Sequence, residues 1–376
     1  MMLMKTTIFS LFTIRMKVIL PMYLMALAVL TACEKEVEFK APGEETSSSL
    51  TINSIAVEGE PLRVFLSRTY TVGQTPNLDI GYSYAFNVDE KSTDYQKPLY
   101  YKKTGVFNAE VKAVVNGSST YSLELAADSM GYTCDYHPKE NDRIEIKAEG
   151  ISAETVVPSR PHIEILNHEV LTGNPYMNMA GLSYDTDTIM SLSCLIREVS
   201  GSQYYRLRVR GERKITQSFD VSVSGELVSH TDYAYYLLQD IYFSDDDLFV
   251  DNRLTKNFGG WPVYFSNVFD DTLIKGGGRS FTVVSPKPSA NMGIADFKGV
   301  TDIMKAQTEE ADIPARVMVE LQAISPELYR YLKSVELYRV SESDAFTEPV
   351  QIYSNVQNGW GIFGSLSSQR IIIPYD

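Results

Sequence analysis

The feature that most constrains the fold is the alternation of apolar and polar residues in short runs along the chain. The runs at 62–66 and 143–148 are examples, with Leu62, Val64 and Leu66 on one face of the first. Successive side chains of a strand point to opposite faces, so a period of two predicts strands with one buried face. The 24 tyrosines favour the same structure, because aromatic residues are enriched in strands. We therefore predict a mainly β fold.

The first part of the chain, residues 50–158, is predicted to form an antiparallel sandwich of immunoglobulin or fibronectin type. Within it, Asn116 and Gly117 separate two alternating runs and are the preferred pair for a two-residue hairpin turn. Residues 69–104 break the alternation with tyrosines among Gly, Pro, Asn and Asp. We interpret this stretch as a Tyr-rich insertion in the sandwich.

A second β-rich domain is predicted over residues 162–376, after a boundary at Pro158–Pro161, because two prolines in four residues cannot continue a central strand. The domain carries one prominent helix, from Pro326 to about Arg339. Ser325 is a natural N-cap and Pro326 suits the first helical position. Strands are predicted at residues 189–199, 204–210, 218–227, 262–268, 280–284 and 315–323.

The N-terminus has the composition of a signal peptide. Residues 18–30 are thirteen uncharged residues, preceded by Arg15 and Lys17. This apolar run has signal-peptide length and is shorter than the roughly 20 residues of a membrane-spanning helix. Met16 could start a compact leader of its own, so both Met1 and Met16 remain candidate start residues.

The end of the leader, Leu30-Thr31-Ala32-Cys33, resembles the lipobox of bacterial lipoproteins. The resemblance implies a signal peptide at 1–32, cleavage before Cys33 and a lipid on its thiol. The charged residues 34–36 resemble the acidic start of lipoproteins sent to the outer cell surface in Bacteroidetes. Residues 33–49 are then a flexible tether, and the protein is expected in the outer membrane, facing the exterior.

The net charge of the chain disfavours one class of partner, and its few cysteines disfavour a disulfide. The net charge is −14, and it becomes −17 in the mature chain because residues 1–32 hold three basic residues and no acid. An acidic surface disfavours nucleic acid, so none is expected as a partner. Only Cys134 and Cys194 remain after Cys33, in different predicted domains. We expect them to be two free thiols rather than a bridge.

The C-terminal part resembles the domain-of-unknown-function family numbered 4249, lipoproteins of Bacteroidetes. The resemblance rests on residues 324–332 and on the closing stretch 349–364, in which Ser354 and Asn355 precede Gly359-Trp360-Gly361-Ile362-Phe363. Family members are thought to accompany TonB-dependent outer-membrane receptors, which implies handling of an unidentified nutrient. The glycines of the closing stretch are predicted to serve a tight turn and close backbone packing.

No local motif predicts catalysis, a cofactor or a metal, so we expect a protein that is not an enzyme. Residues 245–247 with Asp251 are a possible calcium site, but they lack the glycine and final glutamate of an EF-hand loop, and a solvated turn is preferred. Aromatic side chains remain the candidates for ligand contact, since they offer an apolar face and a polar edge. The candidates are Tyr82, Tyr84, Tyr100, Tyr101 and Trp261.

The sequence thus favours a lipid-anchored accessory protein that binds a ligand or partner for a TonB-dependent transporter. Two alternatives remain open. One is a structural or adhesive surface lipoprotein. The other is a hydrolase with dispersed carboxylates, since acids distant in the sequence can meet in a fold.

The lipid anchor can be tested directly by substitution of Cys33. Cells fed an azido-palmitate are expected to label the wild-type protein and not Cys33→Ala, because the thiol is the only attachment atom in this scheme. The measurement is fluorescence of the clicked protein band. Equal labelling of both proteins would contradict lipidation at Cys33.

Overall fold

The structure is a computed structural model that describes residues 49–69, 104–128, 130–172, 188–223, 226–239, 242, 244–251, 266–287, 304–310, 315–342 and 350–375. These residues belong to one compact unit, Ser48–Asp376. The leader, the tether up to residue 48 and most of the Tyr-rich insertion lie outside them. Among the described residues, no helix combines the length and the apolar character needed to cross a membrane.

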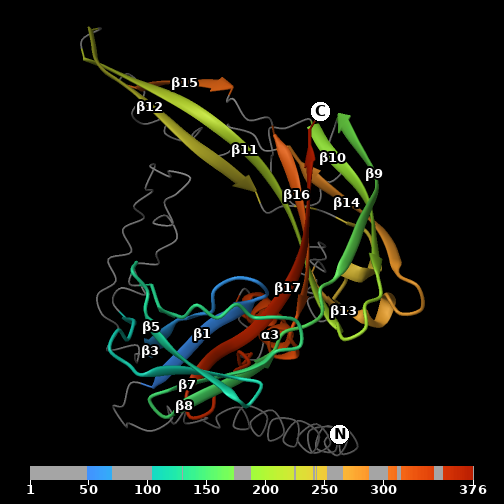
Figure 1. Ribbon diagram of the computed structural model, residues 1–376. Coiled ribbons are helices and arrows are strands. Elements are labelled where there is room, and N and C mark those ends of the chain that lie inside the picture. Colours follow the sequence, from blue (N-terminus) through green and yellow to red (C-terminus); the bar gives the residue numbers. More distant parts are fainter. Residues whose placement is uncertain are drawn as a thin grey trace, which may run out of the picture. The chain divides into compact units, whose positions relative to one another are not determined.

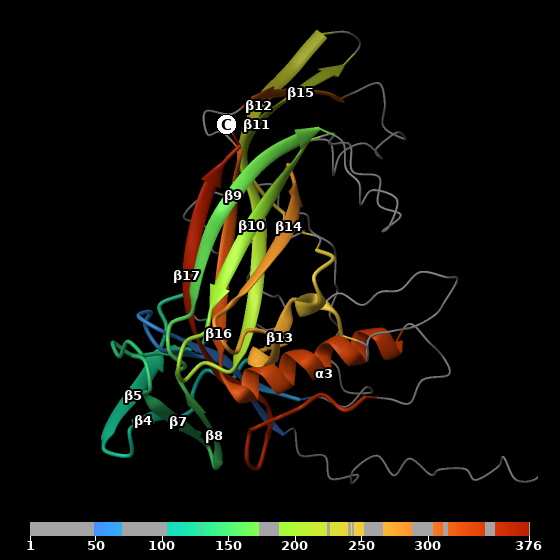
Figure 2. The same cartoon turned by 90° about the vertical axis from the view of Figure 1, so that its right-hand side faces the viewer.

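The described chain is mainly β, as predicted, with one long helix near the C-terminus (Figures 1 and 2). The strands are β1 (Leu50–Val57), β2 (Arg63–Val64), β3 (Leu66–Arg68), β4 (Val111–Val115), β5 (Ser119–Leu125), β6 (Tyr132–Thr133), β7 (Arg143–Ala148), β8 (Ile151–Val156), β9 (His162–Thr172), β10 (Thr188–Arg197), β11 (Tyr204–Val223), β12 (Glu226–Gln239), β13 (Val268–Asp270), β14 (Arg279–Pro286), β15 (Met304–Glu310), β16 (Arg316–Ile324) and β17 (Trp360–Pro374). The helix is α3 (Pro326–Glu342), and two short 3₁₀ helices, η2 (Asp247–Phe249) and η4 (Asp271–Leu273), lie earlier in the chain.

The described strands form three sheets. The largest has the path β12-β11-β16-β17-β1-β3, with β13 and β15 also paired to β11. A three-stranded sheet has the order β14-β10-β9, and a six-stranded sheet has the order β2-β6-β5-β4-β7-β8. The large sheet therefore contains strands from both predicted domains.

The N-terminal sandwich packs β1, β3 and the first half of β17 against the sheet of β4, β5, β7 and β8. One hydrophobic core holds residues from both layers, among them Ile52, Phe363 and Ile146. The alternating residues behave as predicted, because Leu62, Val64, Leu66, Ile144, Ile146 and Ala148 are all buried. The hairpin turn is also confirmed, since Asn116 and Gly117 both have positive φ values, as a type I′ turn requires.

The alternating run that begins at Leu62 predicts one strand, and the structure divides it into β2 and β3, which belong to different sheets. β2 pairs with β6, whereas β3 pairs with β1. The division falls at Phe65, whose backbone N–H donates to the Ser54 side chain at 2.8 Å. At the point where the chain passes from one sheet to the other, the Ser54 hydroxyl thus accepts a hydrogen bond that a backbone carbonyl of a neighbouring strand would otherwise accept.

The second sandwich packs β9, β10 and β14 over β11, β16 and the second half of β17. Its core includes Tyr205, Leu207 and Val209, on the face that the alternation of β11 predicted. The predicted strand 218–227 is wrong in its extent. β11 continues to Val223 and β12 begins at Glu226, so the chain reverses inside that stretch.

Helix α3 begins at Pro326 as predicted and ends three residues beyond the predicted Arg339. The buried Ser325 hydroxyl accepts from Leu328 N at 3.4 Å and from Ser365 N at 3.2 Å, so it joins the helix start to β17. Leu328 is buried against Ile324 and Leu366. The helix therefore packs on the sheet face opposite the core of the second sandwich.

The C-terminal strand β17 links the two sandwiches (Figure 1). Its first half pairs in parallel with β1, from Thr51↔Trp360 to Val57↔Leu366, and its second half pairs antiparallel with β16. At the predicted boundary the backbone oxygen of the buried Ser159 accepts from Ser202 Oγ at 2.7 Å and from Ser367 Oγ at 2.9 Å. The division at Pro158–Pro161 stays a prediction, and the residues there are packed against the second sandwich.

Gly361 provides a test of the close contact between β17 and β1. It has φ +103°, and a Cβ at this position would overlap the carbonyl oxygen of Ile52. Gly150 is a matched control, because it has φ +86° and nothing lies within 4 Å of its Cβ position. In chemical denaturation we expect Gly150→Ala to cost about 1–2 kcal/mol from backbone strain alone. Gly361→Ala is expected to cost at least about 2 kcal/mol more, and equal losses would contradict the close approach.

Candidate functional site

The ligand-contact candidates from the sequence lie outside the described residues. This holds for Tyr82, Tyr84, Tyr100, Tyr101 and Trp261, and for the lipid-attachment residue Cys33. The two other cysteines are described and are free, as predicted. Burial raises the pKa of the Cys194 thiol to about 12 and also raises the pKa of Cys134. Neither is an activated nucleophile, because reactive thiols need a lowered pKa.

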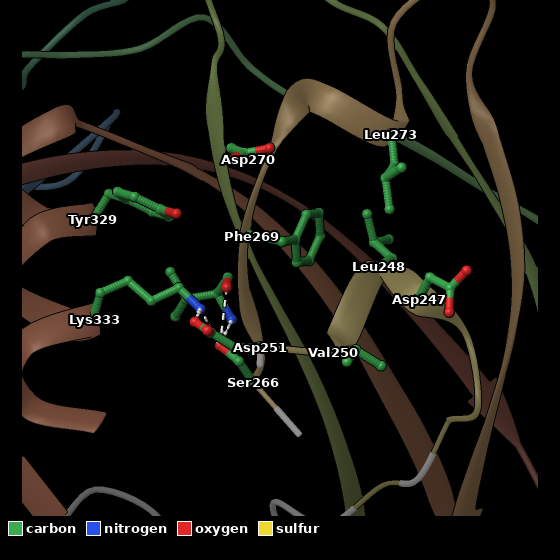
Figure 3. Close-up of a pocket in the computed structure, with 11 residues that line it drawn as sticks. Asp247, Leu248, Val250, Asp251, Ser266, Phe269, Asp270, Leu273, Tyr329 and Lys333 are labelled. Carbon is green, nitrogen blue, oxygen red and sulfur yellow. Dashed lines mark hydrogen bonds and ion pairs between the residues drawn. The ribbon is translucent and has the colours of Figure 1, made fainter. Parts of the chain in front are cut away.

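A group of buried charged side chains lies beside a cavity (Figure 3). Lys333 of α3 is 7% exposed, and its ammonium lies 2.9 Å from Asp251 Oδ2 and 2.6 Å from Ser266 Oγ. Glu336, one turn further along the helix, lies 3.3 Å from the same ammonium. We call Asp251, Ser266, Lys333 and Glu336 the lysine cluster.

The lysine cluster depends on the short helix η2. Asp246 caps this helix by accepting from Leu248 N at 2.9 Å, and Arg279 Nη2 binds both Asp246 carboxylate oxygens at 3.0 Å. Phe249 is anchored in the core of the second sandwich, and its carbonyl accepts from Ser266 N at 2.8 Å. These contacts fix Asp251 and Ser266 opposite α3.

Glu336 adds a second carboxylate to the cluster. The Ser266 hydroxyl lies 2.8 and 3.0 Å from its two carboxylate oxygens while accepting from Lys333. Burial raises the pKa of Glu336 above its ordinary value, although the Lys333 ammonium and the Ser266 hydroxyl oppose the change. Two carboxylates therefore share one ammonium in a largely dehydrated site.

A cavity of about 220 Å³ opens beside the lysine cluster. Lys333 and Tyr329 approach it from α3, whereas Leu248, Val250 and Leu273 approach it from the side of the 3₁₀ helices (Figure 3). Val250 and Leu273 are each 44% exposed. Tyr329 is held by stacking on Tyr204, with ring centroids 4.3 Å apart. The remaining lining residues are Asp247, Asp251, Ser266, Val268, Phe269 and Asp270.

The close Ser266–Lys333 pair is part of a larger set of contacts around the Lys333 side chain. The three donors of the Lys333 ammonium match the three acceptors around it, Asp251, Ser266 and Glu336. The cluster thus holds the Lys333 side chain in one position and fixes one wall of the cavity.

No metal site appears at the aspartates weighed from the sequence. Asp246 caps η2 and pairs with Arg279, and Asp251 pairs with Lys333. Among the described residues there is no group of three side chains of the types that ligate metals.

Sequence reasoning missed the lysine cluster. Tyr329, Lys333 and Glu336 recur at spacings of four and three, so they lie on one face of α3, beside the apolar face that carries Leu328 and Leu332. A Lys and a Glu three residues apart look like a surface ion pair. Only the placement of Asp251 and Ser266, from a distant segment, shows that the pair is buried.

The raised pKa of Glu336 predicts a pH dependence of stability. Because the folded state holds this proton more tightly than the unfolded state, the contribution of Glu336 is present at low pH and is lost as the pH rises through its folded pKa. We expect the free energy of unfolding of the wild type, minus that of Glu336→Gln, to fall as the pH rises above 4.5, the ordinary pKa of a glutamate. The exposed Glu124→Gln is the control. A difference that rises with pH would contradict a raised pKa.

Comparison with known proteins identifies the family. A family model described as a domain of unknown function, DUF4249, matches residues 34–372, which is nearly the whole chain. No curated protein and no solved structure matches it. The chain belongs to the DUF4249 family.

Proposed function

We propose that the protein is a lipid-anchored outer-membrane protein that binds a ligand or partner for a TonB-dependent transporter and performs no catalysis. The observation that carries the proposal is the cavity beside the lysine cluster. It combines a fixed charged wall, an aromatic side chain and two exposed apolar residues, a combination typical of binding sites. The signal-peptide pattern and the lipobox resemblance at Cys33 support the anchor.

The energetics of the lysine cluster support a role for the cavity. Dehydrating three charged groups costs several kcal/mol per ion before their mutual attraction is counted, and apolar replacement of such groups is often neutral or stabilising. A cluster that serves stability alone therefore has little advantage. A cluster that also fixes the wall of a binding cavity has the advantage that a preorganised site loses less entropy when a ligand binds.

The exposed rim offers a contact surface to a larger partner. Val250 and Leu273 lie on the solvent side of the cavity, and neither belongs to a hydrophobic core. Their substitution is therefore expected to change binding without unfolding the protein. The control residue is Leu125 of β5, which is 40% exposed and lies outside the cavity lining.

The test is affinity purification of the tagged protein from detergent-solubilised outer membranes. We expect a TonB-dependent receptor to co-purify with the wild type and with Leu125→Ala. The double variant Val250→Ala, Leu273→Ala is expected to recover at least about ten-fold less receptor, because it removes both exposed apolar side chains of the rim. Quantitative mass spectrometry of the eluate measures the ratio.

Two results would overturn the proposal. One is the absence of any transporter from the wild-type eluate, with the protein instead self-associating on the cell. The other is turnover of a glycan or peptide pool by the wild type that is lost in Ser266→Ala, which would show that the cluster is catalytic.

A further inference from the structure

A second surface lies in the C-terminal part of the chain and shares no lining residue with the lysine-cluster cavity. It is formed by Gln351, Ile352, Tyr353, Ser354, Val356, Gly359 and Trp360, which line a hollow of about 470 Å³. We call it the Trp360 surface. The volume lies within the range of about 300–1,000 Å³ that is usual for small-molecule sites.

The segment that carries this surface has no regular secondary structure but is fixed by side-chain hydrogen bonds. Asn355 Nδ2 donates to the carbonyl oxygens of Glu154 and Phe363, at 3.0 and 2.8 Å, and Asn355 Oδ1 accepts from Phe363 N at 3.0 Å. The backbones of Gln357 and Ser152 exchange two hydrogen bonds. The segment is thus anchored to the N-terminal sandwich by residues that do not themselves need to be exposed.

Helix α3 fixes the other side of the segment. Ser334 Oγ accepts from Tyr353 N at 2.9 Å, and the Arg330 guanidinium lies 5.8 Å from the centre of the Tyr353 ring. Gly359 has no room for a side chain, since a Cβ there would lie 2.7 Å from Leu50 O. The backbone therefore runs close against β1, immediately before Trp360.

What this fixed segment presents to solvent is apolar and aromatic. Trp360 is 48% exposed and Ile352 is 38% exposed, whereas Val356 between them is buried. Ordering a loop costs about 1–2 kcal/mol per residue in backbone entropy. Trp360 begins β17 directly after this segment and lines the hollow together with Ile352. Two exposed apolar side chains beside one hollow recover little of that cost through burial, which points to a binding role.

The lining of the Trp360 surface contains no acidic or basic side chain. This neutrality stands out on a chain with a net charge of −14. An anionic ligand would call for arginine or lysine in the lining, and a cationic one for carboxylates. The lining combines the Trp360 indole with the Gln351 amide and the Ser354 hydroxyl, which matches a neutral ring with one apolar face and hydroxyl groups at its edge.

We propose that the Trp360 surface binds neutral carbohydrate, with the apolar face of a sugar ring stacked on the Trp360 indole and ring hydroxyls bonded to Gln351. The proposal is independent of the transporter role proposed above, because it concerns different residues. Loss of one would leave the other in place.

The chain has two tryptophans, Trp261 and Trp360, so the difference in emission between the wild type and Trp360→Phe reports on this surface. The mature protein is titrated with maltohexaose, cellohexaose and xylohexaose, and with oligogalacturonate as an anionic control. We expect at least one neutral oligosaccharide to change the Trp360 emission, and the anionic one to leave it unchanged.

Isothermal titration calorimetry then compares the substitutions. Trp360→Ala is expected to weaken binding about ten-fold or more, through loss of the stacked ring. Ile372→Ala is the matched control, because Ile372 lies on the same strand and is 51% exposed. It should bind as the wild type does.

Three results would overturn the carbohydrate assignment. They are no heat or emission change with any neutral oligosaccharide, equal affinity of Trp360→Ala and wild type, and a response confined to hydrophobic peptides tested in the same titration. The last result would assign the surface to an apolar peptide segment instead. Circular dichroism of each variant confirms that a lost signal is not lost folding.

Discussion

The pairing of β17 with two different partners is the constraint on which the rest of the structure depends. Its first half closes the N-terminal sandwich beside β1, and its second half completes the second sandwich beside β16. Phe363 fills one core and Ile373 fills the other, ten residues apart on one strand. Because a slip of one residue would turn both side chains to the wrong face, the two sandwiches fix each other's register.

The lysine cluster depends in turn on the sheet that β17 completes. Helix α3 packs on this sheet through Leu328 and Leu366, and the helix then carries Lys333 over to Asp251 and Ser266. Breaking a buried charge pair typically costs about 3–5 kcal/mol, so the cluster tolerates little displacement of the helix. The wall that the lysine cluster forms is therefore rigid, so a ligand has to match the shape of the cavity as it stands.

Local patterns predicted the local elements well, because the physics that forms them is local. The Asn116-Gly117 turn, the buried faces of β7 and β11 and the start of α3 at Pro326 each follow from a few neighbouring residues. The parallel pairing of β1 with β17 joins residues about 310 positions apart, and no periodicity encodes such a pairing. The burial of Lys333 could not be predicted from local sequence either, because its acceptor Asp251 belongs to a distant segment.

Helix α3 serves both candidate binding surfaces with adjacent residues. Lys333 contacts the cavity through the lysine cluster, while the next residue, Ser334, accepts from the backbone of Tyr353 at the Trp360 surface. Arg330, one turn earlier, lies over the Tyr353 ring. A displacement of α3 that opens the cavity would therefore disturb the hydrogen bond that holds the other surface. The two surfaces use separate side chains, but they share one rigid support, and their affinities are independent only while that helix stays in place.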